Sequence, residues 1–407
     1  MTRSGKQPIS SGRGPVGSAV RVSVVSIAVV LFQVGLVVTP SAAMQLGPYK
    51  QVAELTASGA ADGNALGRSV AVTGGTVVVG ASGHDGGAGA GYVFTQVGTG
   101  WRQAILTGTG AVVGDLFGQA VAVSGGTIVA GAVGYDRDMG RAFVFTRTVG
   151  GWSRTGDLVG SGTSAFSYFG QSVGVSGPTV VVGANGYGAG TGRAYVFSHA
   201  ALGWHQVAEL VAPGTATGDL LGQSVAISGT TIVVGAVGHA NGSGLAYVFT
   251  KRATGWARVA ELVGSDTKAL DQFGFSVAIS GTTVVVGAIG HANGSGRAYV
   301  FTKGPTGWHQ VAELRTMDNG AGENFGESVA ISGPVVVVGA PGQAQGAGLA
   351  YVFTEGPTGW HQVAQIKGDD TAAGDSFGGS VAASANAVVV GAWRHAVPTG
   401  SVYIFKR

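Results

Sequence analysis

Residues 224–262 read SVAISGTTIVVGAVGHANGSGLAYVFTKRATGWARVAEL, and the fold can be inferred from this stretch. It contains four short runs of β-branched, aromatic or alternating residues: Ser224 to Gly229, Thr231 to Ala236, Leu245 to Thr250 and Gly255 to Leu262. Gly, Ser, Thr and Asn residues separate the runs, as in tight turns. The stretch therefore predicts four antiparallel strands, and no segment has a helical period.

The same unit recurs along the chain, and a Phe-Gly or Leu-Gly dipeptide marks each copy. The marking residues are Leu66, Phe117, Phe169, Leu221, Phe273, Phe325 and Phe377. They are separated once by 51 residues and then five times by 52 residues. A fixed period of this length is typical of solenoids, propellers and arrays.

The pattern within each copy favours blades around an axis over a linear stack. The second run is apolar on both faces, as in Val284-Val285-Val286, so neighbouring sheets should cover it on both sides. The first run keeps small residues, which suit strands that crowd around an axis. The fourth run alternates charged and apolar residues, as expected for an outer edge.

The two ends of the chain indicate a closed ring. The seventh copy stops after its third strand, Ser401 to Arg407, and Tyr49 to Leu55 supplies the missing fourth strand, since it aligns with Trp204 to Leu210. Residues 44–407 number 364, which is seven times 52. Splitting one blade between the termini closes the ring and protects its edge strands. We predict an all-β fold, a seven-bladed β-propeller of four-stranded blades over residues 44–407.

Residues 1–43 are predicted to be a signal peptide. Basic residues up to Arg21 precede an uncharged stretch from Val22 to Val38, and small residues up to Ala43 suit cleavage at that point. The seventeen-residue stretch also permits an uncleaved signal anchor, which would be the route of any membrane contact. In either case we expect a secreted or cell-surface protein.

Composition narrows the possible functions. Cysteine is absent, which excludes disulfides, thiolate metal sites and cysteine nucleophiles. The leader holds four basic residues and no acid, so the remaining chain has 19 basic and 20 acidic groups, a net charge of −1. This balance offers no electrostatic footprint for nucleic acid. We therefore expect no nucleic-acid partner, and we expect a monomer.

The repeated motifs resemble the FG-GAP repeat of integrin α-chain propellers and of many exported bacterial proteins. F-G-x-S-V-A, V-V-V-G-A and A-Y-V-F recur with variations in all seven copies, and Phe325-Gly326 with Gly339-Ala340-Pro341 carries the literal letters. The resemblance covers the chain after the leader and implies an extracellular propeller for adhesion or ligand binding, with no reaction of its own. Integrin propellers hold Ca²⁺ in D-x-D-x-D-G loops between the first and second strands. Here those connections are short turns such as Ser228-Gly229-Thr230, so integrin-like calcium loops are absent from the sequence.

Polar and aromatic residues in the loops between second and third strands form the first candidate site. Arranged around one face, they could contact a glycan or a peptide, and the histidines would make binding depend on pH at about pH 6. The alternative is that each side chain hydrogen-bonds its own glycine-rich loop. Six tryptophans share one repeat position, where we expect packing between blades, and Trp393 departs from it. The candidates are His84, Tyr135, Tyr187, His239, His291, Gln343, His395 and Trp393.

A polar residue, usually an acid, stands two positions before each Phe-Gly or Leu-Gly and belongs to the second candidate site. Such residues commonly cap turns by accepting backbone hydrogen bonds. The last three copies add a second acid five residues earlier, and oxygen-rich loops of this kind could hold Ca²⁺. The metal candidates are Asp266, Asp271, Asp318, Glu323, Asp370 and Asp375. Solvated turn acids are the alternative, so the sequence assigns no cofactor with certainty.

The sequence favours an exported, non-catalytic binding or adhesion propeller that contacts an extracellular protein or a glycan through its loop-rich face. H-E-x-x-H and P-loop motifs are absent, and the copies have nearly equal lengths, without an insertion that would shape a substrate cleft. Two alternatives stay open. One is a secreted polysaccharide hydrolase or lyase that uses the acidic loops of copies five to seven, and the other is a purely structural envelope protein.

Overall fold

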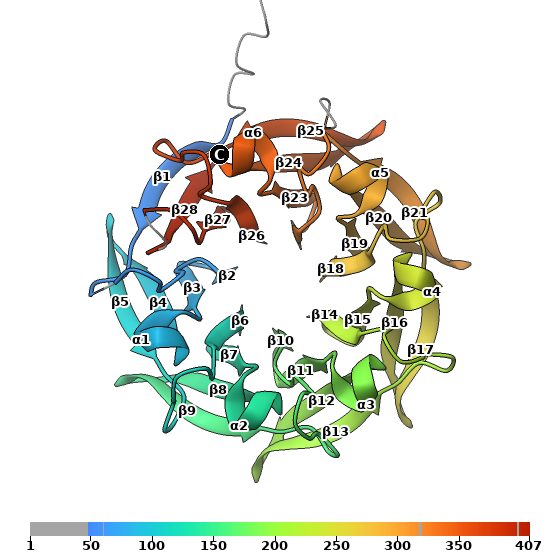
Figure 1. Ribbon diagram of the computed structural model, residues 1–407, viewed down its shortest axis with the longest axis horizontal. Coiled ribbons are helices and arrows are strands. Elements are labelled where there is room, and N and C mark those ends of the chain that lie inside the picture. The colour runs from blue at the N-terminus through green and yellow to red at the C-terminus, as the bar shows by residue number, and fades with distance from the viewer. Residues whose placement is uncertain (1–47, 60, 317–319, 397–398) are drawn as a thin grey trace, which may run out of the picture. The chain divides into compact units, whose positions relative to one another are not determined.

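The computed structural model describes residues 48–59, 61–316, 320–396 and 399–407. These residues form seven four-stranded antiparallel sheets arranged around an axis (Figure 1). The predicted all-β, seven-bladed propeller is confirmed. The predicted leader, residues 1–43, and the metal candidate Asp318 lie outside the described residues. Within the described part of the chain, no helix is both long enough and apolar enough to span a bilayer.

Blades 1 to 6 each take four consecutive strands, from the axis outward. Blade 1 contains β2 (Ser69–Thr73), β3 (Thr76–Ala81), β4 (Ala90–Val97) and β5 (Gly100–Leu106). Blade 2 contains β6 (Phe117–Ser124), β7 (Thr127–Ala132), β8 (Arg141–Thr148) and β9 (Gly151–Leu158). Blade 3 contains β10 (Ser172–Ser176), β11 (Thr179–Ala184), β12 (Arg193–Ala200) and β13 (Gly203–Leu210).

The next three blades repeat this arrangement. Blade 4 contains β14 (Leu221–Ser228), β15 (Thr231–Ala236), β16 (Leu245–Arg252) and β17 (Gly255–Leu262). Blade 5 contains β18 (Phe273–Ser280), β19 (Thr283–Ala288), β20 (Arg297–Gly304) and β21 (Gly307–Leu314). Blade 6 contains β22 (Ser328–Ser332), β23 (Val335–Ala340), β24 (Leu349–Gly356) and β25 (Gly359–Ile366).

Blade 7 joins the two ends of the described chain. It contains β26 (Phe377–Ala383), β27 (Val388–Ala392) and β28 (Ser401–Lys406), and β1 (Lys50–Leu55) completes it as the outermost strand. β1 runs antiparallel to β28, with Glu54 opposite Tyr403. The predicted closure by an N-terminal strand is confirmed.

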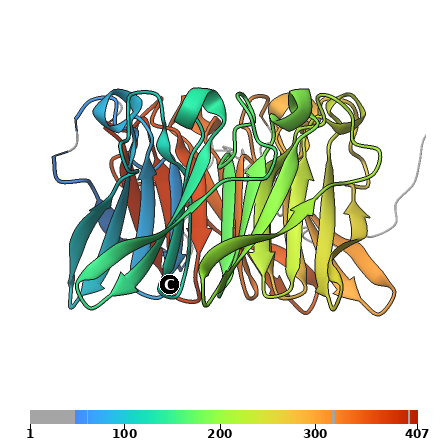
Figure 2. The ribbon, with the colours of Figure 1, turned by 90° about the horizontal axis from the view of Figure 1, so that it is seen from below.

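The loops between second and third strands contain short helical turns, which line one face of the ring (Figure 2). Two inner residues of each turn have positive φ, such as Ala240 and Asn241, so none is a regular helix. The sequence predicts no helix there, because four residues are too few to display a helical period. In the described residues the turns are α1 (His84–Gly87), α2 (Tyr135–Asp138), α3 (Tyr187–Gly190), α4 (His239–Gly242), α5 (His291–Gly294) and α6 (Gln343–Gly346). We call this side of the ring the loop face.

The core lies between neighbouring blades. The second strands are almost wholly buried, as in β3 and β11, where every residue is buried. Each apolar cluster combines facing sheets of two blades, and the marking Phe or Leu residues, such as Phe325, are 0% exposed within them. Trp204 of blade 3 contacts Gly156 of blade 2, so the predicted packing of recurring tryptophans between blades is confirmed.

Neighbouring blades approach closely because glycines face each other. A Cβ atom added to Gly235 of blade 4 would lie 2.1 Å from the carbonyl oxygen of Gly274 in blade 5. The hydroxyl of Ser224 donates a hydrogen bond to the same carbonyl at 2.8 Å. The first and last blades meet in the same way, since Ser380 Oγ donates to the Gly67 carbonyl at 2.7 Å. The Gly and Ser residues of the repeat therefore form contacts between neighbouring blades.

The close approach predicts a large penalty for one added methyl group. We expect Gly235→Ala to lower the free energy of unfolding by about 3 kcal/mol or more, because its Cβ meets rigid backbone. Gly150, in an open hairpin turn, has no atom within 4 Å of an added Cβ, so Gly150→Ala should change stability by less than about 0.5 kcal/mol. Urea unfolding measures both values, and equal effects would contradict the interpretation.

Blade 2 offers a test of the serine contact, because Ala120 stands where the other inner strands have serine. We expect Ala120→Ser to stabilise the protein by about 1 kcal/mol, since its hydroxyl would reach the Gly170 carbonyl. Ser224→Ala should cost a similar amount. Thermal unfolding of the two variants should shift the melting temperature in opposite directions, and shifts of the same sign would refute the assignment.

Candidate functional site

The loop-face histidines are half-buried and bind acids of the preceding turn. His239 Nδ1 lies 3.0 Å from Asp219 Oδ2, and His291 Nδ1 lies 2.9 Å from Asp271 Oδ2. His395 Nδ1 lies 2.8 Å from Asp375 Oδ2. Their side chains are between 12% and 33% exposed. The loop histidines thus meet the turn acids, although the sequence predicts the two groups as separate sites. This pairing is neither ligand contact by the histidines nor a hydrogen bond within their own glycine-rich loops.

The remaining loop candidates make other contacts. His84 Nδ1 lies 3.3 Å from the hydroxyl of Tyr92. The guanidinium group of Arg141 lies over the Tyr135 ring, 4.2 Å from its centroid. The guanidinium group of Arg193 lies over the Tyr187 ring in the same way, at 4.1 Å. Gln343 is 8% exposed and donates to the hydroxyl of Tyr351 at 3.2 Å. These side chains contribute little free surface to the loop face.

The acids before the inner strands cap turns, as the sequence predicts. Asp271 Oδ2 accepts from the backbone N–H of Lys268 at 2.8 Å, three residues earlier. Asp375 accepts from Ala372 N at 2.7 Å, and Glu323 accepts from Gly320 N at 2.7 Å. Each carboxylate therefore replaces a hydrogen bond that the turn would otherwise take from water.

The second acids lie beside buried tyrosines. The hydroxyl of Tyr299 donates to Asp266 Oδ1 at 2.7 Å, and the hydroxyl of Tyr403 donates to Asp370 Oδ1 at 2.8 Å. The other oxygen of each acid faces the nearby histidine, 3.5 Å from its Nε2 atom in both blades. Blades 5 and 7 thus contain the same array of two acids, one histidine and one tyrosine.

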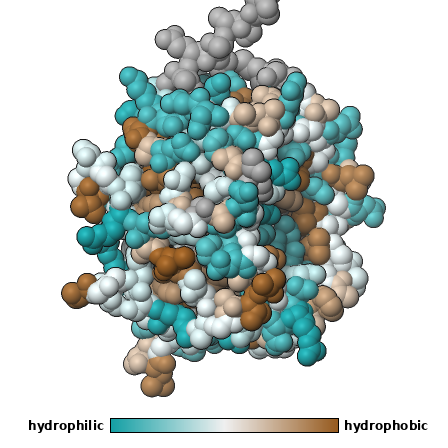
Figure 3. Space-filling view, turned by 60° about the vertical axis from the view of Figure 1, so that its left-hand side comes forward, coloured by the Kyte–Doolittle hydropathy of each residue, from teal (hydrophilic) through white to brown (hydrophobic). Residues whose placement is uncertain are grey.

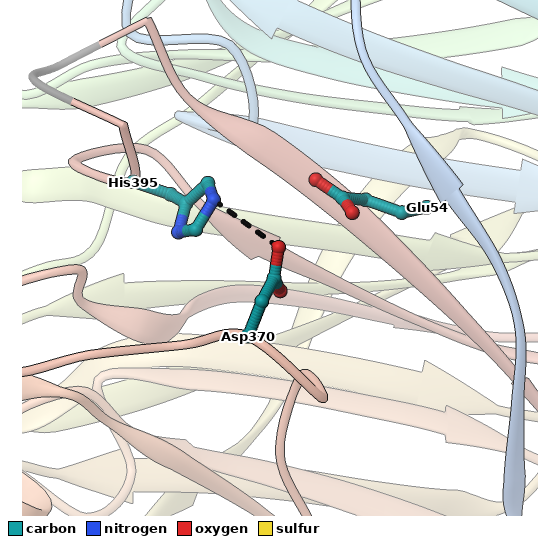
Figure 4. A group of neighbouring side chains, drawn as sticks. All are labelled: Glu54, Asp370 and His395. Atoms are coloured by element: carbon teal, nitrogen blue, oxygen red, sulfur yellow. Dashed lines mark ion pairs between the residues drawn. The ribbon is translucent and has the colours of Figure 1, made fainter.

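In blade 7 this array gains a third carboxylate. The ligand atoms of Glu54, Asp370 and His395 all lie within 4.8 Å of one another, and no other group of three His, Cys, Asp or Glu residues in the described chain converges this closely. Figure 4 shows the Glu54 carboxylate, on β1, directed toward the Asp370 carboxylate and the His395 ring. Glu54 and Asp370 are exposed, and His395 is half-buried.

A second cluster lies on the axis, at the loop-face end of the inner strands, because residues just before it hydrogen-bond the short helical turns, as the Leu116 N–H does to the Gly87 carbonyl. The residues that directly follow the Phe-Gly and Leu-Gly dipeptides line a cavity of about 240 Å³ together with the inner strands of all seven blades. We call this ring the axial mouth: Arg68, Gln119, Gln171, Gln223, Phe275, Glu327 and Gly379. Burial raises the pKa of the Glu327 carboxyl and lowers the pKa of the Arg68 guanidinium. The ring combines neutral amides, one acid, one base and one aromatic side chain.

Trp393 borders the axial mouth. An added Cβ at Gly379 would lie 3.1 Å from the Trp393 indole, so glycine at this position makes room for the ring. The guanidinium carbons of Arg68 and Arg394 lie 5.5 and 4.3 Å from the centre of the indole. Its Nε1 atom is buried without a hydrogen-bond partner among the described residues. Among the sequence-predicted candidates, Trp393 lies against two residues of the axial mouth, Arg68 and Gly379.

Sequence reasoning missed Glu54 and the charged residues of the axial mouth. The sequence predicts that Glu54 belongs to an outer strand, and its approach to His395 depends on how the ring closes. Arg68 and Glu327 stand at one repeat position that changes from blade to blade. Comparison of the seven copies at that position was the signal that could have found them.

Burial raises the pKa of tyrosines on the third strands. The pKa of Tyr195 is raised to about 12, mainly by burial and against the opposing charge of Arg193. The pKa values of Tyr299 and Tyr403 are also strongly raised, first by burial and then by hydrogen bonds to Asp266 and Asp370. In the folded state these phenols stay neutral where unfolded tyrosines ionise.

Stability should therefore fall in alkaline solution. A raised folded pKa gives a contribution that is complete below the unfolded value of 10.0 and is lost as pH rises toward the folded value. Above about pH 10 each such tyrosine should cost about 1.4 kcal/mol of unfolding free energy per pH unit. Urea unfolding across this range measures the slope, and Tyr195→Phe should make it shallower. An unchanged slope in that variant would refute the assignment to Tyr195.

Exposed apolar side chains do not gather into one binding patch on the side seen in Figure 3, where brown groups stand apart among polar ones. Several belong to hairpin turns at the end of the blades opposite the loop face, such as Val149 and Leu202. Single exposed apolar residues are normal on soluble proteins. The polar axial mouth is therefore the better-formed candidate for ligand contact.

Comparison with known proteins agrees with the repeat structure. The FG-GAP repeat family matches residues 49–94, 101–145, 152–197, 204–249, 256–301, 308–353 and 360–405. Each match runs from the outer strand of one blade through the third strand of the next. No curated protein matches the chain in sequence. Among solved structures, the crystal structure of Saccharomyces cerevisiae Sqt1 is similar, with a TM-score of 0.49 and 11% identity, covering 86% of this chain and 83% of that one.

Proposed function

Because the chain belongs to the FG-GAP repeat family, we propose that it is an exported, non-catalytic binding or adhesion propeller. It acts as a monomer and contacts an extracellular protein or a glycan through its loop face. The family and the propeller fold support a binding or structural role. Export, the ligand and the absence of catalysis are parts of the proposal.

The axial mouth is the observation that carries this proposal. Positions that pack the blades are the same in nearly every copy, whereas this ring carries amide, acidic, basic, aromatic and glycine residues in turn. Packing does not demand such variety, so the ring is free to present specific polar groups. Its volume of about 240 Å³ lies below the roughly 300 to 1,000 Å³ of pockets for drug-sized ligands, so the group proposed to enter it is small, one sugar unit or one peptide side chain.

The acidic loops support binding over hydrolysis. Asp271 and Asp375 each accept a backbone hydrogen bond and a histidine hydrogen bond, and their side chains are 9% and 11% exposed. A glycosidase needs two carboxylates that both reach the scissile bond. The oxygen atoms of these two carboxylates already accept hydrogen bonds within the protein, so they are poorly placed to act on a substrate.

Variants of the axial mouth test the proposal. We expect Arg68→Ala and Trp393→Ala to weaken binding to arrayed glycans and immobilised extracellular proteins at least tenfold, about 1.4 kcal/mol, because Arg and Trp often dominate binding energy. Leu202→Ser is the matched control, since Leu202 is exposed on the opposite face. Its binding should equal that of the unchanged protein.

Three results would contradict the proposal in different ways. Loss of binding in Leu202→Ser alone would place the contact on the opposite face. Glycan consumption that disappears in Asp271→Asn and Asp375→Asn would identify a hydrolase or lyase. Failure to bind any arrayed glycan or protein would favour a structural envelope role.

A further inference from the structure

The last position but one of the outer strand carries a carboxylate in five blades, and in four of them an arginine pairs with it. Three of the four arginines occupy the first residue of the third strand in the same blade. The cationic guanidinium thus belongs to the standard environment of this carboxylate. The pairs are Asp157 with Arg141, Glu209 with Arg193, Glu261 with Arg258 and Glu313 with Arg297.

Glu54 is the fifth carboxylate, and blade 7 provides no arginine for it. The third strand of blade 7 begins with Ser401, which is 1% exposed and donates to Glu54 Oε1 at 2.8 Å. Within the described chain Glu54 forms no ion pair with a lysine or arginine. It faces Asp370 and His395 in place of a guanidinium (Figure 4). Two carboxylates therefore meet where blades 2 to 5 pair the carboxylate with an arginine.

A hydrogen bond to Asp375 orients the His395 ring so that its Nε2 atom faces the uncompensated carboxylates. Asp375 Oδ2 accepts from the backbone N–H of Ala372 and lies 2.8 Å from His395 Nδ1, which assigns the proton to Nδ1. The Nε2 lone pair then points toward Asp370 Oδ2, 3.5 Å away. A carboxylate that accepts from the second nitrogen is one of the common partners of a metal-ligating imidazole.

We propose that Glu54, Asp370 and His395 form a zinc site. Zn²⁺ binds imidazole nitrogen and carboxylate oxygen at about 2.0 to 2.2 Å, and three protein ligands leave one tetrahedral position open. Calcium prefers six to eight oxygen ligands, so an imidazole nitrogen is not one of its usual ligands. Tetrahedral ligands are roughly 3.4 Å apart, so the two exposed carboxylates would rotate inward from their present separation within 4.8 Å.

The zinc ion would connect the two ends of the propeller. Glu54 belongs to the N-terminal strand β1, whereas Asp370 and His395 belong to the C-terminal part of blade 7. Because unfolding must separate these elements, bound zinc should stabilise the closed ring. This inference does not depend on the proposed role of the axial mouth.

The sharpest test leaves every proposed ligand in place. In chelator-treated protein we expect calorimetric titration with Zn²⁺ to show one site, and Ser401→Arg to weaken it at least tenfold, because the new guanidinium would neutralise Glu54. Arginine fits this position in blades 2, 3 and 5, so the variant should fold. Zinc should raise the melting temperature of the unchanged protein by a few degrees and leave that of Ser401→Arg unchanged.

Blade 5 allows the reverse experiment. It has the same acids, histidine and tyrosine, and Arg297 is its difference at the Ser401 position. We expect Arg297→Ser to release Glu313 toward Asp266 and His291 and to raise the zinc stoichiometry from one to two. Circular dichroism in chelator checks that each variant keeps its strands.

Several outcomes would overturn the proposal. These are no zinc binding by the unchanged protein, equal affinity in Ser401→Arg, and tighter binding of Ca²⁺ than of Zn²⁺. His395→Ala should abolish the site, and retained zinc affinity in that variant would assign the metal to other residues. A zinc-induced shift of the His395 ring signals in NMR spectra would support direct ligation.

Discussion

The contact of one blade's glycine with the next blade's backbone is the constraint on which the propeller depends. An added Cβ at Gly235 or Gly339 would lie about 2 Å from a glycine carbonyl of the following blade, so no larger residue fits. The close approach lets Ser224 and its equivalents donate across the gap. It also brings the second strands together, which buries their apolar faces on both sides. The packing of the core thus depends on these glycines, because they have no side chain to keep the blades apart.

The same contact closes the ring and divides the molecule into constant and variable positions. Gly391 and Gly67 meet as the other pairs do, so blade 7 and blade 1 are ordinary neighbours although they come from opposite ends of the chain. With the scaffold held in this way, positions that face the axis or lie at loop ends can differ between blades. Arg68, Glu327 and Ser401 occupy such positions.

Repetition also supplies internal controls for the chemistry of the loops. Blades 5 and 7 share the histidine, both acids and the tyrosine, yet Arg297 holds Glu313 in one and Ser401 leaves Glu54 uncompensated in the other. In blade 5 the guanidinium of Arg297 therefore compensates the Glu313 carboxylate. In blade 7 the carboxylates of Glu54 and Asp370 lie close together where the first and last strands of the chain meet. One residue changes an ion-paired turn into a candidate cation site.

The number of blades, the order of strands and the closure follow from the amino-acid sequence alone, because the period, the apolar runs and the missing strand are all local patterns. It also predicted the turn-capping acids, since Asp375 bonds a backbone N–H only three residues away. Tertiary structure decided which of these side chains meet. His395 and Asp375 are twenty residues apart, and Glu54 joins them across more than three hundred residues. Such contacts depend on the path of the chain around the axis, and no spacing along the sequence measures that path.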